Sequence, residues 1–195
     1  MTPARRDRIG PNAILQLLPV IDRQDGPEGT RRMLAAAGLA GTPDGTRMIP
    51  ETEAAGLHRA LRRLMPRQAA GMAAEAGRGT ADYILAHRIP KPAQMLLKAL
   101  PAPLSARLLA RAIAGHAWTF AGTGEFRVVD PWTFEIRDNP LIRGETAATP
   151  LCAWNAAVFG HLYATLVDRT CRCVETDCAA ASGSHICRFR IRRGQ

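Results

Sequence analysis

The apolar residues of this chain change their period once, at about residue 120. Before that point they recur at helical spacing, as in Leu57, Leu61 and Leu64, and proline and glycine separate one helical segment from the next. After it, the segments 125–130 and 133–138 alternate apolar with charged residues, which is typical of strands with one buried face. The pattern predicts a helical N-terminal part followed by a part that contains a sheet.

The second part predicts a strand-strand-helix-strand-strand order. A helix is expected from Pro150 to about Val167, with Thr149 as its cap, and a second strand pair at 169–177 and 185–192. This order favours an α+β fold in which the helical N-terminal part packs on an antiparallel sheet. We expect 1–109 and 110–195 to form one globular domain, with a ligand groove between the helices and the sheet.

The chain is strongly basic. Its 195 residues carry a formal net charge of +9, and all but two of the 26 cationic residues are arginine. Near the end, Arg188, Arg190 and Arg192 alternate with apolar residues, which predicts the solvated face of a terminal strand; an anion-binding surface is the alternative. No RNA-recognition, zinc-finger or helix-turn-helix signature is present, so nucleic acid is not an expected partner.

The sequence predicts a cytoplasmic protein. The apolar run near the start is short and interrupted by Pro19, which argues against a secretory signal, and no stretch reaches the roughly 20 apolar residues of a transmembrane segment. The five cysteines are therefore expected to be reduced. A homodimer is among the expected assemblies.

All five cysteines lie in the last quarter of the chain. Cys152 opens a helical segment, a glutamate precedes Cys178 by three residues, and a turn of small residues leads to Cys187. This arrangement resembles the 4-vinyl reductase domain family over about residues 110–193. The residues that carry the resemblance are Asn139, Pro140, Cys152, Trp154, Gly160, Glu175, Cys178, Gly183, Cys187 and Phe189.

The resemblance implies a small-molecule-binding α+β domain that is related in fold to haem-based nitric oxide sensors. Its tetrapyrrole branch works on or carries chlorophyll precursors. We therefore expect an accessory or carrier protein of bacteriochlorophyll biosynthesis that handles a Mg-porphyrin or protochlorophyllide-type intermediate. Expected partners are enzymes of that pathway, such as magnesium chelatase or the Mg-protoporphyrin methyltransferase.

Two alternatives stay open. One is a divinyl (4-vinyl or 8-vinyl) protochlorophyllide reductase, although reduction needs a hydride donor and no NAD(P), flavin or iron–sulfur motif is visible. The glycines at 77–80 lie in a helical segment, and those at 122–124 lead into a strand. The other is a zinc-stabilised regulatory or scaffold domain.

A flat tetrapyrrole requires an apolar slot with aromatic walls and an axial ligand for its metal. Ordinary core packing is the alternative interpretation of each aromatic residue. The candidate axial ligands all lie in helical segments and are His58, His87, His116 and His161. His116 and His161 are favoured because His116 precedes Trp118 and His161 follows Trp154 by two helical turns. The predicted tetrapyrrole-binding residues are His116, Trp118, Phe120, Trp132, Trp154, Phe159 and His161.

The family positions Cys152, Cys178 and Cys187 predict a tetrahedral zinc site, with His185 or Cys173 as the fourth ligand. Strand alternation sends the side chains at 173 and 178 to opposite faces, so a site that includes both requires a bulge. Buried thiols without metal are the alternative. Side chains two apart on a strand share one face, so the carboxylates at 175 and 177 are interpreted as a solvated face.

Overall fold

A computed structural model of the chain describes residues 7–194. Helices dominate up to residue 121, as the period of the apolar residues predicts. The elements in this part are β1 (Arg8–Ile9), α1 (Asn12–Leu15), α2 (Leu18–Ala36), β2 (Ile49–Pro50), α3 (Glu51–Leu64), α4 (Ala69–His87), α5 (Lys91–Ala99), α6 (Ala102–Gly115) and α7 (Trp118–Ala121).

The remaining elements build the sheet and its helix. They are β3 (Glu125–Asp130), β4 (Thr133–Arg137), the short 3₁₀ helix η2 (Pro140–Ile142), α8 (Ala153–Leu166), β5 (Arg172–Asp177), α9 (Ala179–Ser182) and β6 (Ile186–Arg192). The four strands are ordered β3-β4-β6-β5, and every neighbouring pair is antiparallel. The predicted α+β fold with an antiparallel sheet is confirmed.

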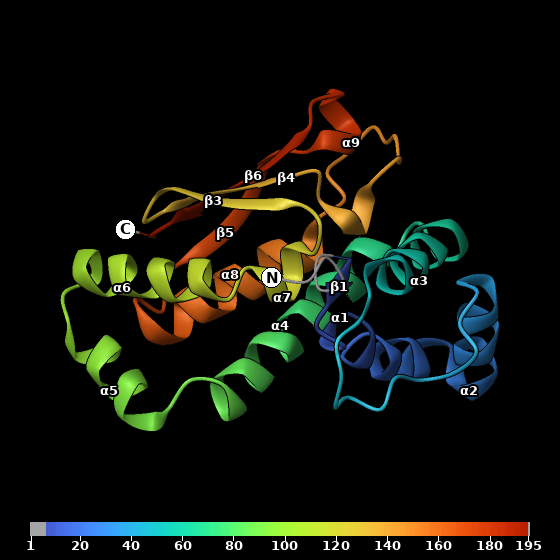
Figure 1. Ribbon diagram of the computed structural model, residues 1–195, viewed down its shortest axis with the longest axis horizontal. Coiled ribbons are helices and arrows are strands. Elements are labelled where there is room, and N and C mark those ends of the chain that lie inside the picture. The colour runs from blue at the N-terminus through green and yellow to red at the C-terminus, as the bar shows by residue number, and fades with distance from the viewer. Residues whose placement is uncertain (1–6, 195) are drawn as a thin grey trace.

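The elements form layers (Figure 1). The sheet is the upper layer, α8 lies beneath it with α6 beside α8, and α4 packs along the other side of α8. Thus α8 is covered by the sheet on one side and by the helical N-terminal part on the other. This placement explains why α8 is apolar around its whole circumference rather than along one stripe.

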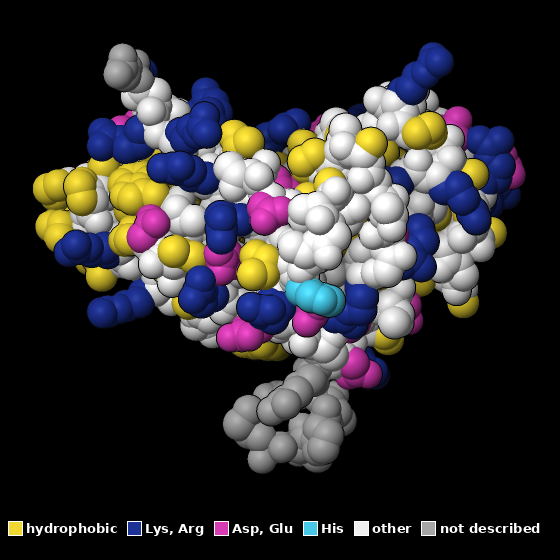
Figure 2. All heavy atoms as spheres, turned by 90° about the horizontal axis from the view of Figure 1, so that it is seen from above, with side chains coloured by type: hydrophobic (Ala, Val, Ile, Leu, Met, Phe, Trp, Pro, Cys, Tyr) yellow, Lys and Arg dark blue, Asp and Glu magenta, His cyan; other side chains and the backbone are white. Residues whose placement is uncertain are grey.

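The two faces of the sheet differ as strand alternation predicts. Phe134 and Phe189 point toward α8 and are fully buried, whereas the arginines of β6 point outward. On the outer face Arg127 and Arg188 both pair with Glu135, at 2.9 and 2.7 Å. Figure 2 views the molecule from the sheet side and shows arginine and lysine side chains spread over it.

Gly26 has φ +70° and kinks α2, in agreement with the expectation that glycine and proline separate helical segments. The start of a later helix differs from the sequence prediction. The helix expected from Pro150 begins at Ala153 instead, because the backbone N–H groups of Leu151 and Cys152 bond to side chains of the site described below. None of the helices in residues 7–194 combines the length and apolar character that crossing a bilayer requires.

Candidate functional site

Three thiols and one carboxylate converge between α8 and the end of the sheet that lies next to α9. Cys152 precedes α8, Glu175 lies in β5, Cys178 follows β5 directly, and Cys187 lies in β6. One sulfur or oxygen atom from each residue lies within 4.8 Å of the corresponding atoms of the other three. Four residues from three separate segments therefore share one small volume, which we call the cysteine–glutamate centre.

A bulge in β5 brings Cys178 into the centre. The register between β5 and β6 shifts between Glu175 and Asp177, so one extra residue is accommodated there. The shift returns Cys178 to the face that looks toward α8, where Glu175 already lies. Regular alternation would place Cys178 on the face opposite residues 173 and 175, and the bulge instead brings Cys178 beside Glu175, while Cys173 stays outside the centre. Glu175 was interpreted as part of a solvated face, and that interpretation is wrong.

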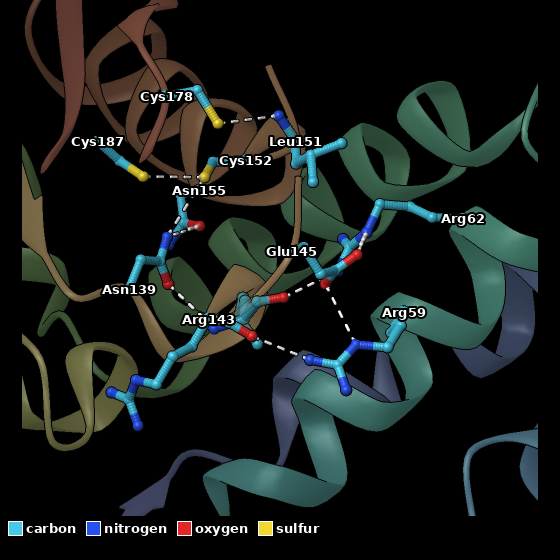
Figure 3. A network of polar contacts seen from close by, with 11 residues as sticks. Arg59, Arg62, Asn139, Arg143, Glu145, Leu151, Cys152, Asn155, Cys178 and Cys187 are labelled. Carbon is cyan, nitrogen blue, oxygen red and sulfur yellow. Dashed lines mark hydrogen bonds and ion pairs between the residues drawn. The ribbon is translucent and has the colours of Figure 1, made fainter. Parts of the chain in front are cut away.

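The centre is rich in hydrogen-bond donors (Figure 3). The backbone N–H of Leu151 donates to the sulfur of Cys178 at 3.4 Å, and the thiol of Cys152 donates to the sulfur of Cys187 at 3.5 Å. The neighbouring thiols of Cys152 and Cys187 lower the pKa of Cys178 well below its ordinary value. Negative charge is therefore stabilised on this sulfur, and a thiolate is the form that binds metal.

Glu175 is the residue whose bonding is incomplete. Its Oε2 accepts the backbone N–H of Cys152 at 2.8 Å, but its Oε1 is buried and has no hydrogen-bond partner among residues 7–194. Burial raises the pKa of this carboxyl to about 8. A buried carboxylate oxygen without a partner costs free energy, and coordination to a cation would remove that cost.

The donor set of the centre fits zinc. Three sulfurs and one carboxylate oxygen are ligands that Zn²⁺ takes in tetrahedral sites, where bonds of about 2.3 Å separate the sulfurs by roughly 3.8 Å. The separation of 3.5 Å between the sulfurs of Cys152 and Cys187 is close to that value. Glu175, rather than His185 or Cys173, would supply the fourth ligand, because His185 is exposed beside Asp138 and Cys173 packs against Gly160.

A polar network connects the centre to the helical part (Figure 3). The side-chain amide of Asn139 donates to the sulfur of Cys152 and to the side chain of Asn155, and its oxygen caps η2 by accepting from Leu141. The carbonyl of Leu141 accepts in turn from Arg62 of α3. The 3₁₀ helix η2 thus joins the centre to α3.

An apolar groove of about 480 Å³ lies between α6 and the β3–β4 hairpin. This volume is within the usual range for small-molecule sites. Two cations rim it, Arg107 and Arg111, which lie one turn apart on α6 and form no ion pair or hydrogen bond within residues 7–194. The residues that line the groove are Leu100, Leu104, Arg107, Leu108, Ala110, Arg111, Ala114, Val128 and Pro131.

The predicted pigment-binding aromatic residues are divided among several places. Phe120 and Phe159 belong to a packed stack with Phe126, Phe134 and Phe189, in which neighbouring ring centroids are 5.1 to 6.0 Å apart. This stack fills the space between α8 and the sheet. The three tryptophans lie outside it: Trp132 against Tyr163, Trp154 against His58, and Trp118 half exposed at the surface.

The predicted axial ligands differ in what their nitrogens contact. The Nδ1 of His116 lies 2.9 Å from the carbonyl of Ala112 and must donate to it, which leaves Nε2 as the unprotonated nitrogen of the neutral ring. His116 is exposed and follows α6 directly. The Nε2 of His161 instead pairs with Asp82 at 2.7 Å. Contact of these histidines and aromatic residues with a pigment stays a prediction.

Solved structures of H-NOX proteins share this fold. An H-NOX protein of K. algicida matches with a TM-score of 0.62 and 9% identity, covering 96% of this chain and 97% of its own. One from S. oneidensis matches with a TM-score of 0.58 and 10% identity, covering 96% and 100%. The chain thus has the α+β fold seen in H-NOX proteins, as the family resemblance implied, together with a buried cysteine–glutamate centre.

Sequence comparisons define the family. The model of the 4-vinyl reductase domain matches residues 132–193, which include all four residues of the centre. The "Bacteriochlorophyll synthase 23 kDa chain" of Cereibacter sphaeroides is 52% identical over 191 residues, 97% of this chain and 92% of that relative. The protein of the same name from Rhodobacter capsulatus is 46% identical over 93% of this chain and 87% of its own. The chain belongs to the 4-vinyl reductase domain family, together with these bacteriochlorophyll synthesis proteins.

Proposed function

We propose that this protein is a tetrapyrrole carrier of bacteriochlorophyll synthesis, which binds a Mg-porphyrin or protochlorophyllide-type intermediate and presents it to an enzyme of the pathway. The names of its two relatives support a role in that pathway. The apolar groove between α6 and the β3–β4 hairpin is the observation that supports binding of a flat apolar ligand.

The chemistry of the groove suits such a ligand. Its walls are leucine, alanine, valine and proline side chains, which favour removal of a macrocycle from water. Arg107 and Arg111 are free of acidic partners within the described chain, so both guanidinium groups are available for the carboxylates of a porphyrin. The residues that line this groove support the expectation of a ligand site between the helices and the sheet.

His116 is the axial ligand that we propose. Its position immediately after α6 places it next to the element that forms one wall of the groove. The hydrogen bond from its Nδ1 to Ala112 fixes the ring and leaves Nε2 able to bind a metal. His58 is buried and its Nε2 contacts the carbonyl of Ala13, so it is a core residue and is not proposed as the axial ligand.

We propose a structural role for the cysteine–glutamate centre. Zinc bound by Cys152, Glu175, Cys178 and Cys187 would cross-link the start of α8, β5 and β6. This keeps the zinc-stabilised scaffold as the second candidate function. The cysteine–glutamate centre and the groove are separate in the fold, so the centre can stabilise the protein while the groove binds the ligand.

Titration with Mg-protoporphyrin tests the carrier. We expect a shifted Soret band and quenched tryptophan fluorescence at micromolar ligand. Incubation with a divinyl substrate and NADPH, with and without cell extract, tests the reductase alternative. A carrier leaves the substrate unreduced when the pure protein acts alone, and turnover by the pure protein would overturn the carrier in favour of the reductase.

A further inference from the structure

Half of the large hydrophobic residues that are exposed in the described chain lie on α5 and α6. They are Met95 and Leu96, 64% and 56% exposed, and Leu104 and Leu108. Figure 2, seen from above, shows hydrophobic side chains gathered at the end of the molecule where Figure 1 places α6, with cationic side chains around them. Exposed apolar residues that cluster in this way indicate an interaction surface.

Charge distinguishes this surface from the rest of the chain. Residues 83–124 contain no aspartate or glutamate, whereas they contain five lysine and arginine residues, including the only two lysines of the protein. Lys91 and Lys98 lie on the exposed side of α5, and Arg107 and Arg111 lie on the exposed side of α6. We call these four cations and the four exposed apolar residues the α5–α6 patch.

Charge complementarity selects the occupant of the patch. A second copy of the chain would bring the same cations face to face across a two-fold axis, and that repulsion disfavours a homodimer through this surface. A bilayer with anionic lipid matches both parts of the patch. Its acyl chains can contact the apolar side chains, and its headgroups can contact the surrounding cations. An acidic protein would pair with the cations, but it would also need apolar pockets to accept the exposed leucines and the methionine.

We infer that the α5–α6 patch docks this protein peripherally on a bilayer that contains anionic lipid. Met95 and Leu96 enter the interface, and Lys91 and Lys98 contact the phosphate groups. The mouth of the groove lies on α6 within the same patch, so docking brings the groove to the surface of the bilayer. A ligand that partitions into lipid would then enter the groove without crossing bulk water.

Flotation with vesicles tests the inference with protein free of pigment. Vesicles of phosphatidylcholine with one-third phosphatidylglycerol should bind the wild-type chain, and vesicles of phosphatidylcholine alone should bind it far less. The Lys91→Gln/Lys98→Gln variant should lose about 25-fold in partition, since each cation contributes about fivefold. The Met95→Ser/Leu96→Ser variant should lose at least about tenfold. None of these residues lines the groove.

Matched changes elsewhere serve as controls. Arg63→Gln/Arg67→Gln removes two exposed cations, and Leu64→Ser/Val174→Ser removes two exposed apolar side chains, both away from the patch. Circular dichroism checks that every variant is folded. Absence of binding to anionic vesicles, equal losses in the control variants, or a dimer that dissociates in Met95→Ser/Leu96→Ser would each overturn the inference. Because no pigment is present, these outcomes are distinguishable from failure of the carrier.

Discussion

Gly77 of α4 packs so closely on α8 that a methyl group on its Cα would collide with the carbonyl oxygen of Trp154. The same methyl group would lie 2.8 Å from the Cβ of Ala157. Both approaches are closer than atoms in contact allow, and the nearest atom is main chain, which cannot move aside cheaply. The glycine therefore permits the close contact between the helical part and the helix beneath the sheet.

Replacement of Gly77 by alanine should destabilise the protein by about 1–3 kcal/mol, because the overpacked interface must separate. Gly71→Ala is the matched control, since Gly71 lies in the same helix and the added methyl group meets no other described segment within 4 Å. Alanine there should stabilise by up to about 1 kcal/mol through helix propensity. Urea denaturation measures both, and a Gly77→Ala variant as stable as Gly71→Ala would contradict the close contact.

The same interface leads us to propose that 1–109 and 110–195 unfold as one unit. Since α8 is covered by α4 as well as by the sheet, neither part retains its core when the other unfolds. Helix content by circular dichroism and tryptophan fluorescence should therefore give a single coincident transition. Two separate transitions would show two independent domains.

His58 should make stability depend on pH. The side chain is buried, and desolvation together with the charge of Arg62 lowers its pKa to about 4 from an ordinary 6.5. The unfolded chain therefore takes up a proton that the folded chain refuses, so stability is unaffected above pH 6.5 and falls as the pH drops toward 4. By pH 5 the loss is about 2 kcal/mol.

His58→Gln removes this titration because the glutamine side chain does not ionise. Its amide can still donate to the carbonyl of Ala13, so the buried contact is kept. Urea denaturation at pH 7 and pH 5 should give the wild type the larger drop, by about 2 kcal/mol. Equal drops in the two proteins would show that His58 is not the group responsible. The T-shaped contact between His58 and Trp154 gives the tryptophan emission as a second readout.

Protein purified without chelator should contain one zinc per chain. Cys178→Ser and Glu175→Gln should each reduce the zinc content and lower stability, because each removes one of four ligands. Cys173→Ser is the control, since that thiol packs against Gly160 outside the centre and should keep the metal. Elemental analysis measures the zinc content of each protein, and thermal unfolding measures its stability. Metal-free wild-type protein of undiminished stability would contradict a zinc centre.

His116→Gln should weaken the shift of the Soret band when Mg-protoporphyrin is added, whereas His161→Gln should leave it unchanged. The difference arises because Nε2 of His161 is already bonded to Asp82, and Nε2 of His116 is not engaged within residues 7–194. Absorbance spectra of the two variants at saturating ligand make the comparison. Identical spectra for His116→Gln and wild type would remove His116 as the axial ligand.

The sequence predicted the strands and most helices because their apolar patterns are local. The strand at 125–130 has the predicted limits, and the alternation of β6 is reproduced in its burial. The start of α8 was missed because it depends on distant partners: Leu151 donates to Cys178, and Cys152 donates to Glu175, more than 20 residues away in each case. Spacing along the chain carries no information about those bonds.

The candidate site was predictable in part. The family pattern predicts the three cysteines, whereas regular alternation assigns Glu175 to a solvated face because it does not reveal the bulge that follows this residue. The sequence predicts a groove between the helices and the sheet but not which residues line it, because α6 has apolar residues on two sides. Leu109 and Leu108 are neighbours in sequence, yet only Leu109 is covered in the fold. Which side becomes covered depends on the position of β3.

Titration of Mg-protoporphyrin against paired arginine variants tests the carrier most directly. The Arg107→Gln/Arg111→Gln variant should bind the pigment at least about tenfold more weakly than wild type, since it loses two charge-assisted contacts to carboxylates. The Arg63→Gln/Arg67→Gln variant, with the same change in net charge, should bind like wild type. Equal affinity in all three proteins, or no binding by any of them, would contradict a pigment site in the groove between α6 and the β3–β4 hairpin.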